Sequence, residues 1–440
     1  MKRIILACAA LAVSVAMMAQ PWVNESTGPY LPTAENLAER EAFQDTHFGV
    51  FLHWGLYAML ATGEWTMTNK DLAYDEYQKL AGGFYPSHFN ADEWVAAIKD
   101  AGAGYVCFTS RHHEGFSMWN TAQSDYNVVK ATPFGRDVVG ELADACHRQD
   151  VRLHLYYSII DWWRDDAPRG RTGLGTKRPG VAEDYGHYYQ FMKNQLTELL
   201  TGYGKVGAIW FDGEWDQDQN PDFNWHMRGL YDHIHSIQPQ CLVGNNHHHA
   251  VAPGEDIQIF ERDLPGENKA GLSGQSISRL PLETCETMNG MWGYKITDQN
   301  YKDTPTLIRY LVHAAGLGAN LLLNIGPQPD GNLPQTALDR LKDMGVWMRQ
   351  YGESVKGTRA GDVAPHEWGV TTRKGNKLYV HVFDCKDDAL FLPLDCKVTS
   401  AVCMNTNTPV AYERVKGGIV VNGLTAIPAD VDRIITLTTK

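Results

Sequence analysis

The chain has 440 residues, of which 43% are hydrophobic and 21% are charged, so it can bury a large core and is not a disordered protein. Its formal net charge is −13 and its Lys and Arg residues form no long run, which argues against a nucleic-acid partner or an anionic-membrane surface. The 13 Trp and 20 Tyr residues, many of them beside polar residues, are suited to stacking on sugar rings.

The first 19 residues have the pattern of a secretory signal peptide. Lys2 and Arg3 form a basic start, residues 4–18 are apolar, and Ala19 is a suitable cleavage position. We therefore expect an exported protein, periplasmic or secreted. The apolar stretch is too short to span a bilayer comfortably and no later segment approaches the required length, so no membrane span is predicted.

Residues 20–357 alternate between short apolar runs and amphipathic helical patterns. Strands are predicted at 47–55, 104–113, 151–158, 207–213, 241–246, 280–288 and 319–327. Helices are predicted between them, at 91–102, 135–150, 183–204, 223–238 and 304–318. This alternation predicts a parallel α/β protein, and without a glycine-rich nucleotide-binding motif after the first strand it favours a TIM-like (β/α)8 barrel.

The pattern changes after residue 357. Alternating segments at 377–383, 397–404, 417–423 and 432–439 predict the antiparallel strands of a small β-sandwich over residues 358–440. The sandwich is expected to pack against the barrel. Seven cysteines, an odd number without a CxxC pair, follow the signal peptide, so no disulfide framework is expected, and one bridge among Cys385, Cys396 and Cys403 stays open.

Several predicted strands end in side chains that can bind or transform a sugar. They supply imidazoles, carboxylates, phenols and an indole: His53, Glu64, Trp65, His112, His113, Tyr156, Tyr157 and Asp212. Active sites of (β/α)8 barrels lie at the carboxyl ends of the strands. The sequence therefore predicts that these residues converge on one site.

A catalytic metal and a catalytic serine both fit the sequence poorly. His247, His248 and His249 are consecutive, but neighbouring side chains on a strand point to opposite faces, and no HExxH motif is present. The chain has no GxSxG motif, and Ser158 has no obvious base. We expect neither a metal nor a cofactor.

Paired carboxylates explain the pattern better. Glycoside hydrolysis uses one carboxylate to attack the anomeric carbon and another to protonate the departing oxygen. Asp212, at the tip of an apolar strand, suits the ionised nucleophile. The acid belongs on a downstream segment, and the residues alone leave four candidates open: Glu255, Glu261, Glu283 and Glu286.

The motifs resemble, in the same order, those of the α-L-fucosidase family, glycoside hydrolase family 29. They cover roughly residues 45–335 and read "FGVFLHWGLYA", "SRHHEGFSMWNT", "LYYSIIDWW", "IWFDGEW", "ETCETMNGMWGY" and "GANLLLNIGPQPDG". The resemblance implies a somewhat irregular barrel followed by a C-terminal β-sandwich. It also implies a retaining, metal-free hydrolase that acts on fucosylated oligosaccharides or glycoconjugates.

The resemblance also implies roles for single residues. Asp212 matches the nucleophile, and Glu261 is the best match to the acid/base, although "IFE" replaces the family's "TPE" and leaves Glu255 and Glu283 open. The residues that match sugar-binding positions are His53, Glu64, Trp65, His112, His113, Tyr157, Trp210 and Trp292. His247 stands where some members have arginine, so two alternatives stay open: a same-fold enzyme with another specificity, such as for galactosides, and a non-catalytic sugar-binding relative.

Overall fold

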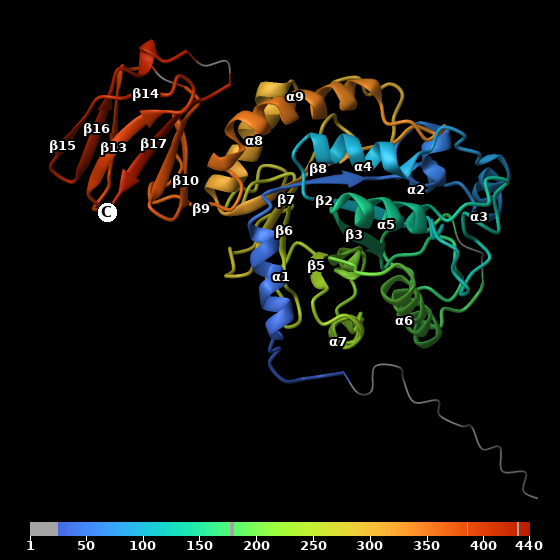
Figure 1. The fold of residues 1–440 in the computed structure, drawn as a ribbon. Helices are drawn as coiled ribbons and strands as arrows, with labels where there is room; N and C mark the ends of the chain where they lie inside the picture. The colour runs from blue at the N-terminus through green and yellow to red at the C-terminus, as the bar shows by residue number, and fades with distance from the viewer. Residues whose placement is uncertain (1–24, 177–179, 385, 429–430) are drawn as a thin grey trace, which may run out of the picture.

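The computed structural model describes residues 25–176, 180–384, 386–428 and 431–440. The predicted signal peptide lies outside the described residues. The chain forms a barrel of parallel strands wrapped by helices, with a β-sandwich standing to one side of it (Figure 1). This is the predicted fold class, and the structure confirms it.

Eight parallel strands build the barrel in the order β5-β4-β3-β2-β1-β8-β7-β6, and a bridge between Gly244 and Ile257 brings β5 and β6 together at the seam. Their bounds are β1 (Phe48–Leu52), β2 (Tyr105–Arg111), β3 (Arg152–Ser158), β4 (Ala208–Asp212), β5 (Leu242–Asn246), β6 (Gln258–Glu261), β7 (Leu282–Thr287) and β8 (Ala319–Ile325). The residues of β1, β2, β4, β5 and β8 are buried throughout, as expected for strands covered on both faces.

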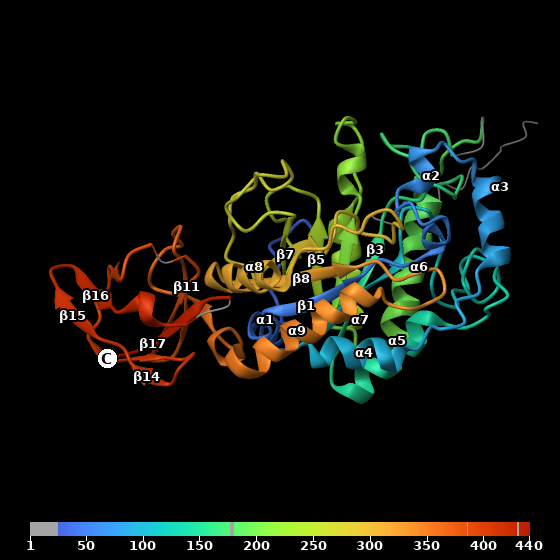
Figure 2. The same ribbon diagram turned by 90° about the horizontal axis from the view of Figure 1, so that it is seen from above.

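Amphipathic helices pack their apolar faces on the outside of the barrel (Figure 2). The larger ones are α4 (Ala91–Asp100), α5 (Val138–Gln149), α6 (Tyr185–Gly202), α7 (Met227–Ile237), α8 (Thr304–Gly316) and α9 (Gln335–Tyr351). Four of them start at a side chain that accepts a backbone N–H of the first turn: Asn90, Asp137, Asp184 and Asp303. Short helices fill the loops after β1 and β4: η1 (Leu56–Leu60), α2 (Thr66–Asn69), α3 (Tyr74–Tyr77), η2 (Gln78–Gly83) and η3 (Glu214–Gln217).

The barrel is irregular between β5 and β7. Strand β6 is a finding that sequence patterns missed, because its four residues are too few to show a period. The connections before and after it, residues 247–257 and 262–281, contain no helix. Two neighbouring strands therefore carry long irregular loops at the carboxyl end of the barrel.

One end of the barrel is filled and the other is open. Helix α1 (Ala34–Gln44) brings Phe43 against Tyr105, with ring centroids 5.4 Å apart, at the amino end of β2. Above this contact, the inward side chains of the strands form an aromatic and aliphatic layer that includes Phe51, Tyr156 and Trp210. Among the described residues, this packing fills the amino end of the barrel and leaves its open end at the carboxyl ends of the strands.

The C-terminal sandwich has a six-stranded sheet in the order β14-β13-β17-β11-β10-β9 and a three-stranded sheet in the order β12-β16-β15. Their bounds are β9 (Arg359–Ala360), β10 (Gly369–Lys374), β11 (Lys377–Val382), β12 (Ala389–Leu392), β13 (Val398–Cys403), β14 (Thr408–Pro409), β15 (Tyr412–Val415), β16 (Gly418–Asn422) and β17 (Arg433–Thr439). Cys396 and Cys403 are free thiols, and Cys385 lies outside the described residues.

The sandwich packs on α8 and α9 of the barrel. Arg309 of α8 donates to the backbone oxygens of Val431 (2.9 Å) and Phe383 (3.2 Å). Val370 of β10 lies in the same apolar cluster as the barrel helices. The two parts of the chain thus share a core at their junction.

Candidate active site

Asp212 lies at the end of β4, where neighbouring strands and a turn supply hydrogen-bond donors. The hydroxyl of Tyr156 donates to Asp212 Oδ2 at 2.9 Å, and Trp215 Nε1 donates to Oδ1 at 2.9 Å. Asn246, which pairs with Asp212 in the β4–β5 register, donates to Oδ1 from Nδ2 at 3.4 Å. These contacts hold the carboxylate in a fixed orientation at the strand tip.

Glu261 is the last residue of β6 and reaches the same place from the other side of β5. Asn246 Nδ2 donates to Glu261 Oε2 at 2.8 Å, so one amide nitrogen serves both carboxylates. The two acceptor oxygens therefore lie no more than about 6 Å apart, an upper limit that is compatible with the roughly 5–5.5 Å of retaining glycosidases and shorter than the roughly 6.5–9.5 Å of inverting ones.

The two carboxyl groups differ in proton affinity. Burial, reinforced by the negative charge of Glu261, raises the pKa of Asp212 to about 6. Burial also acts on Glu261, but hydrogen bonds from His248 (3.1 Å) and Asn246 lower the pKa of Glu261 below its ordinary value. In the free site the last proton therefore favours Asp212.

The loop after β5 presents His248 to Glu261 in a strained backbone conformation. His248 has φ 67° and Arg262, which follows Glu261, has φ 58°, the left-handed region that non-glycine residues rarely adopt. His247 anchors this loop. It accepts from the backbone N–H of His249 at Nδ1 and contacts Glu255 Oε1 from Nε2 at 2.9 Å, away from the carboxylate pair.

Three histidines line the cavity as neutral imidazoles. Burial lowers the pKa of His53 and His113 to about 3, and it lowers the pKa of His112 well below its ordinary value. The Asn324 amide donates to the Trp292 carbonyl (2.7 Å), which turns its oxygen toward His53 Nδ1 at 2.7 Å. His53 therefore carries its proton on Nδ1, and its Nε2 is free to accept a hydrogen bond.

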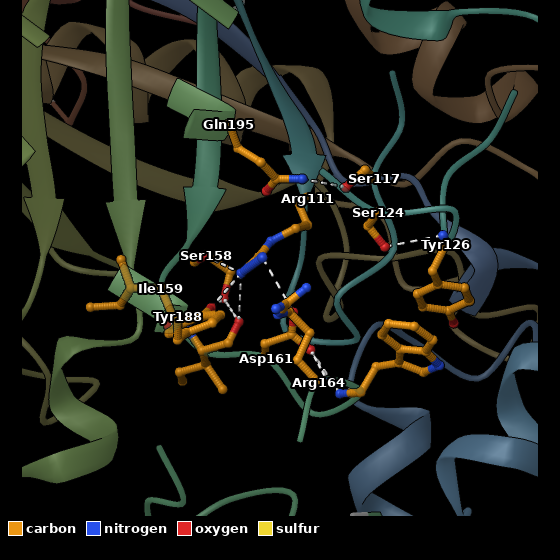
Figure 3. A network of polar contacts seen from close by, with 12 residues as sticks. Arg111, Ser117, Ser124, Tyr126, Ser158, Ile159, Asp161, Arg164, Tyr188 and Gln195 are labelled. Atoms are coloured by element: carbon orange, nitrogen blue, oxygen red, sulfur yellow. Dashed lines mark hydrogen bonds and ion pairs between the residues drawn. The ribbon is translucent and has the colours of Figure 1, made fainter. Parts of the chain in front are cut away.

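A buried ion pair between Arg111 and Asp161 supports His113 through Ser158. Arg111, at the end of β2, contacts Asp161 at 3.2 Å and donates to the Ser158 carbonyl at 3.0 Å (Figure 3). The Ser158 hydroxyl lies 2.7 Å from His113 Nδ1, while His113 Nε2 lies 3.5 Å from Asp212 Oδ2. The network thus aims the second ring nitrogen at the cavity.

The cavity of about 220 Å³ has room for one sugar ring and is walled by aromatic side chains. Among the predicted site residues, eight line it: His53, Trp65, His112, His113, Trp210, Asp212, Glu261 and Trp292. Tyr156, one of the strand-end residues expected at the site, also lines the cavity, and so do Trp215, Asn246 and His248, which the sequence prediction did not assign to the site. Asn246 could have been predicted as a site residue, because it is the last residue of the strand predicted at 241–246.

Two predicted sugar-binding residues lie behind the cavity wall. Tyr157 faces the helix layer, where its hydroxyl donates to Gln195 of α6 at 2.8 Å, and Tyr156 occupies the inward position. Glu64 is buried and accepts from the backbone N–H of Gly293 at 2.7 Å, next to Trp292. The structure therefore brings neither side chain to the cavity surface.

Of the four glutamates left open by the sequence, only Glu261 lines the cavity. Glu255 holds His247 and the hydroxyl of Tyr231 (3.1 Å) outside it. Glu286 faces outward to Lys302 at 3.4 Å. Glu283 is buried inside the barrel beneath Trp210.

The described residues offer neither a metal centre nor a membrane-spanning helix. Within residues 25–176, 180–384, 386–428 and 431–440, no group of three or more His, Cys, Asp or Glu side chains could hold a metal ion. No helix in these ranges is long and apolar enough to cross a membrane.

A carboxylate pair in an aromatic, sugar-sized cavity at the carboxyl end of a parallel barrel defines a glycoside hydrolase. Known proteins agree with this class. The profile of the family described as Alpha-L-fucosidase matches residues 17–353. The chain therefore belongs to the α-L-fucosidase family, glycoside hydrolase family 29, and is a retaining glycoside hydrolase.

Relatives match along most of their length. An alpha-L-fucosidase of Dictyostelium discoideum is 27% identical over 91% of this chain and 93% of its own. The alpha-L-fucosidase isoenzyme 1 of Paenibacillus thiaminolyticus is 33% identical with a TM-score of 0.82, over 92% of this chain and 100% of its own. A Bacteroides thetaiotaomicron GH29 alpha-L-fucosidase, solved as a covalent intermediate trapped with 2-fluoro-fucosyl fluoride, is 25% identical with a TM-score of 0.81, over 94% of this chain and 98% of its own.

Proposed function

We propose that this protein removes terminal α-L-fucosyl residues from fucosylated oligosaccharides or glycoconjugates, with Asp212 as nucleophile and Glu261 as acid/base. The observation that carries the proposal is the Asn246 amide nitrogen shared by Asp212 and Glu261. It keeps an oxygen of each carboxylate within about 6 Å of the other, which is compatible with the spacing of double displacement. The fucoside substrates named for its relatives support the choice of sugar.

In the first step the Asp212 carboxylate attacks the anomeric carbon, and the bond to the leaving oxygen breaks while Glu261 transfers its proton to that oxygen. In the second step Glu261 takes a proton from a water molecule, which attacks the same carbon and releases Asp212. The free site favours the last proton on Asp212. Substrate binding is expected to move it to Glu261, because the glycosidic oxygen offers that proton an acceptor.

The cavity wall supplies contacts for the sugar hydroxyls and for an apolar face. His53, His112 and His113 are neutral and can accept or donate directed hydrogen bonds. Trp292 offers an apolar surface for the C5 methyl group of fucose, and Glu64 holds the adjacent backbone at Gly293.

Azide rescue separates the two carboxylate roles. Asp212→Gly is expected to lose turnover of an aryl α-L-fucoside and, with azide, to give the β-L-fucosyl azide, because azide enters from the nucleophile's side. Glu261→Ala is expected to slow an unactivated substrate by about 10²–10⁴-fold and, with azide, to give the α-L-fucosyl azide. Glu286→Ala, an outward-facing glutamate, is the control.

The roles would be wrong if either rescued product had the opposite anomeric configuration. Turnover of an aryl β-galactoside but not of the fucoside by the wild-type protein would indicate another specificity. Absence of turnover on both would favour a non-catalytic sugar-binding protein.

We also propose that the protein is exported and loses residues 1–19. The support is the basic, apolar and small-residue order of the N-terminal sequence. Mass spectrometry of the protein from its native host should give a mature chain that begins at Gln20. An intact N-terminus in the cell interior would contradict export.

A further inference from the structure

Glu283 is a buried acid that the reaction does not use. It lies inside the barrel on β7 with 0% exposure, and its carboxylate accepts from the Tyr105 hydroxyl at 2.6 Å and from Trp210 Nε1 at 2.8 Å. Among the described residues no Lys, Arg or His forms an ion pair with it, and the titratable groups that face it are Tyr105, Cys107 and Cys285. Such burial is costly, so the two hydrogen bonds are its main compensation.

Trp210 links Glu283 to the active site, because it contacts Glu283 and also lines the cavity. It stands two positions before Asp212 on the inward face of β4 and lines the cavity. Its ring stacks on Tyr156 with centroids 5.5 Å apart and planes at 24°. The indole N–H donates to Glu283, which does not line the cavity, so this bond sets the plane that the ring presents to the cavity.

We propose that Glu283 is a positioning residue, which fixes the Trp210 ring beneath the sugar and, through its stacking on Tyr156, steadies the hydroxyl that holds Asp212. The inference rests on the proposed role of Asp212. Side chains that touch the substrate need such support because a displacement of about 1 Å at an active site can cost 10²-fold in rate. Glu283 itself makes no contact with the cavity.

The sequence of β1 contributes to this arrangement. A Cβ atom at Gly49 would lie 2.3 Å from Tyr105 Cζ, so glycine leaves the space that the Tyr105 ring occupies on its way to Glu283. Burial raises the pKa of Glu283 to about 7. The Trp210 bond persists in either protonation state, because a protonated carboxyl keeps a carbonyl oxygen for the indole and can donate its O–H to Tyr105.

Substitutions at Glu283 separate positioning from mere burial. Glu283→Gln keeps an oxygen for Trp210 and an N–H for Tyr105, so its kcat/KM on an aryl α-L-fucoside should stay within about threefold of wild type. Glu283→Met has a similar length and no strong acceptor, so kcat/KM should fall about ten- to hundredfold. Glu286→Met, on the same strand but facing outward, should change neither kcat nor KM.

The indole N–H of Trp210 gives a direct readout by ¹⁵N NMR, with its signal assigned from Trp210→Phe. The signal should shift in Glu283→Met, whereas in Glu283→Gln it should lie near the position that the wild-type signal takes at low pH, where Glu283 is protonated and neutral. In the wild type it should titrate with a midpoint near 7, and this step should vanish in Glu283→Gln, a test that holds even if the Met variant fails to fold.

Three results would overturn the inference. They are a Met variant with wild-type kcat/KM, a Gln variant as impaired as the Met variant, and a Trp210 signal that does not respond to Glu283. A wild-type protein without fucosidase activity would instead refute the proposed function, and the NMR titration would still test the contact between Glu283 and Trp210.

Discussion

Asp212 and Glu261 form a coupled pair whose members receive different hydrogen bonds. Trp215 and Tyr156 donate to Asp212, while His248 donates to Glu261 and Asn246 to both. Close carboxylates that interact this strongly lose their protons in two steps that belong to the pair. One proton on the pair is the state that can both attack and protonate.

The upper limb of the pH–rate profile should therefore report the last proton. Because the pKa of Asp212 is raised to about 6, kcat/KM of the free enzyme should fall as the pH rises through about 6. Trp215→Phe removes a donor that lowers the pKa of Asp212, so that pKa rises and the upper limb should move to higher pH. The measurement is kcat/KM for an aryl fucoside between pH 4 and 9.

Trp225→Phe is the matched control, because its indole donates to the backbone oxygen of Glu214 at 3.0 Å and does not contact Asp212. It should leave the limb in place. A limb that moves to lower pH in Trp215→Phe would contradict the proposed charge balance.

Sequence patterns predicted some site residues and could not predict others. Asp212 could be predicted from the sequence because it ends an apolar strand inside a distinctive motif. The choice between Tyr156 and Tyr157 depends on strand register: Tyr156 pairs with Trp210 and both face inward, and nothing in an adjacent Tyr–Tyr pair states which one does. His248 acts through a left-handed backbone conformation, which no side-chain pattern encodes.

At the scale of elements, the strands that could be predicted were those whose apolar runs are long enough to be recognised in the sequence. Strand β6 has four residues and owes its place to pairing with β7, a contact between distant segments, so it was missed. The turn after β3 is held by another non-local contact. Asp161 caps it by accepting the N–H groups of Trp163 and Arg164 at 2.8 Å each and pairs with the buried Arg111.

Asp161→Ala should lower the free energy of unfolding by about 3–5 kcal/mol, because it leaves Arg111 buried and unpaired. It should also reduce kcat/KM, since Arg111 supports the Ser158–His113 contact. Urea unfolding followed by fluorescence gives the first value and aryl fucoside kinetics the second. Asp125→Ala removes an exposed pair with Lys130 and should leave both unchanged. Equal effects of the two substitutions would contradict the structural role given to Asp161.

At the scale of the whole molecule, the barrel and sandwich meet along α8. Gly316, the last residue of that helix, allows close approach: a Cβ atom there would lie 2.6 Å from Val370 Cβ of the sandwich. Both parts were predictable because their hydrophobic patterns differ. The barrel alternates short apolar strands with helices of period 3.6, whereas the sandwich has strands of period 2. The domain boundary at residue 357 stays a prediction. The contact between Gly316 and the sandwich could not be predicted from hydrophobic periodicity, because it joins distant segments of the chain.

Gly316→Ala should lower the unfolding free energy by about 1–3 kcal/mol through overpacking at this junction. Gly202→Ala, at the end of α6 with no atom within 4 Å of the new methyl group, should leave it unchanged or raise it by up to about 1 kcal/mol. Thermal and urea unfolding of both variants test the difference. A Gly316→Ala protein as stable as the wild type would show that the sandwich can move away without cost.

The helix-free connections around β6 divide the active site into two halves with different freedom to vary. The proposed nucleophile, Asp212, stands on β4, which α6 precedes and α7 follows in the chain, whereas His248 and Glu261 stand beside segments 247–257 and 262–281, which contain no helix. Insertions and exchanges in such loops disturb a fold less than changes in its helices. Evolution or protein engineering could therefore change which aglycone is accepted by altering segments 247–257 and 262–281, while β4 and Asp212 stay unchanged.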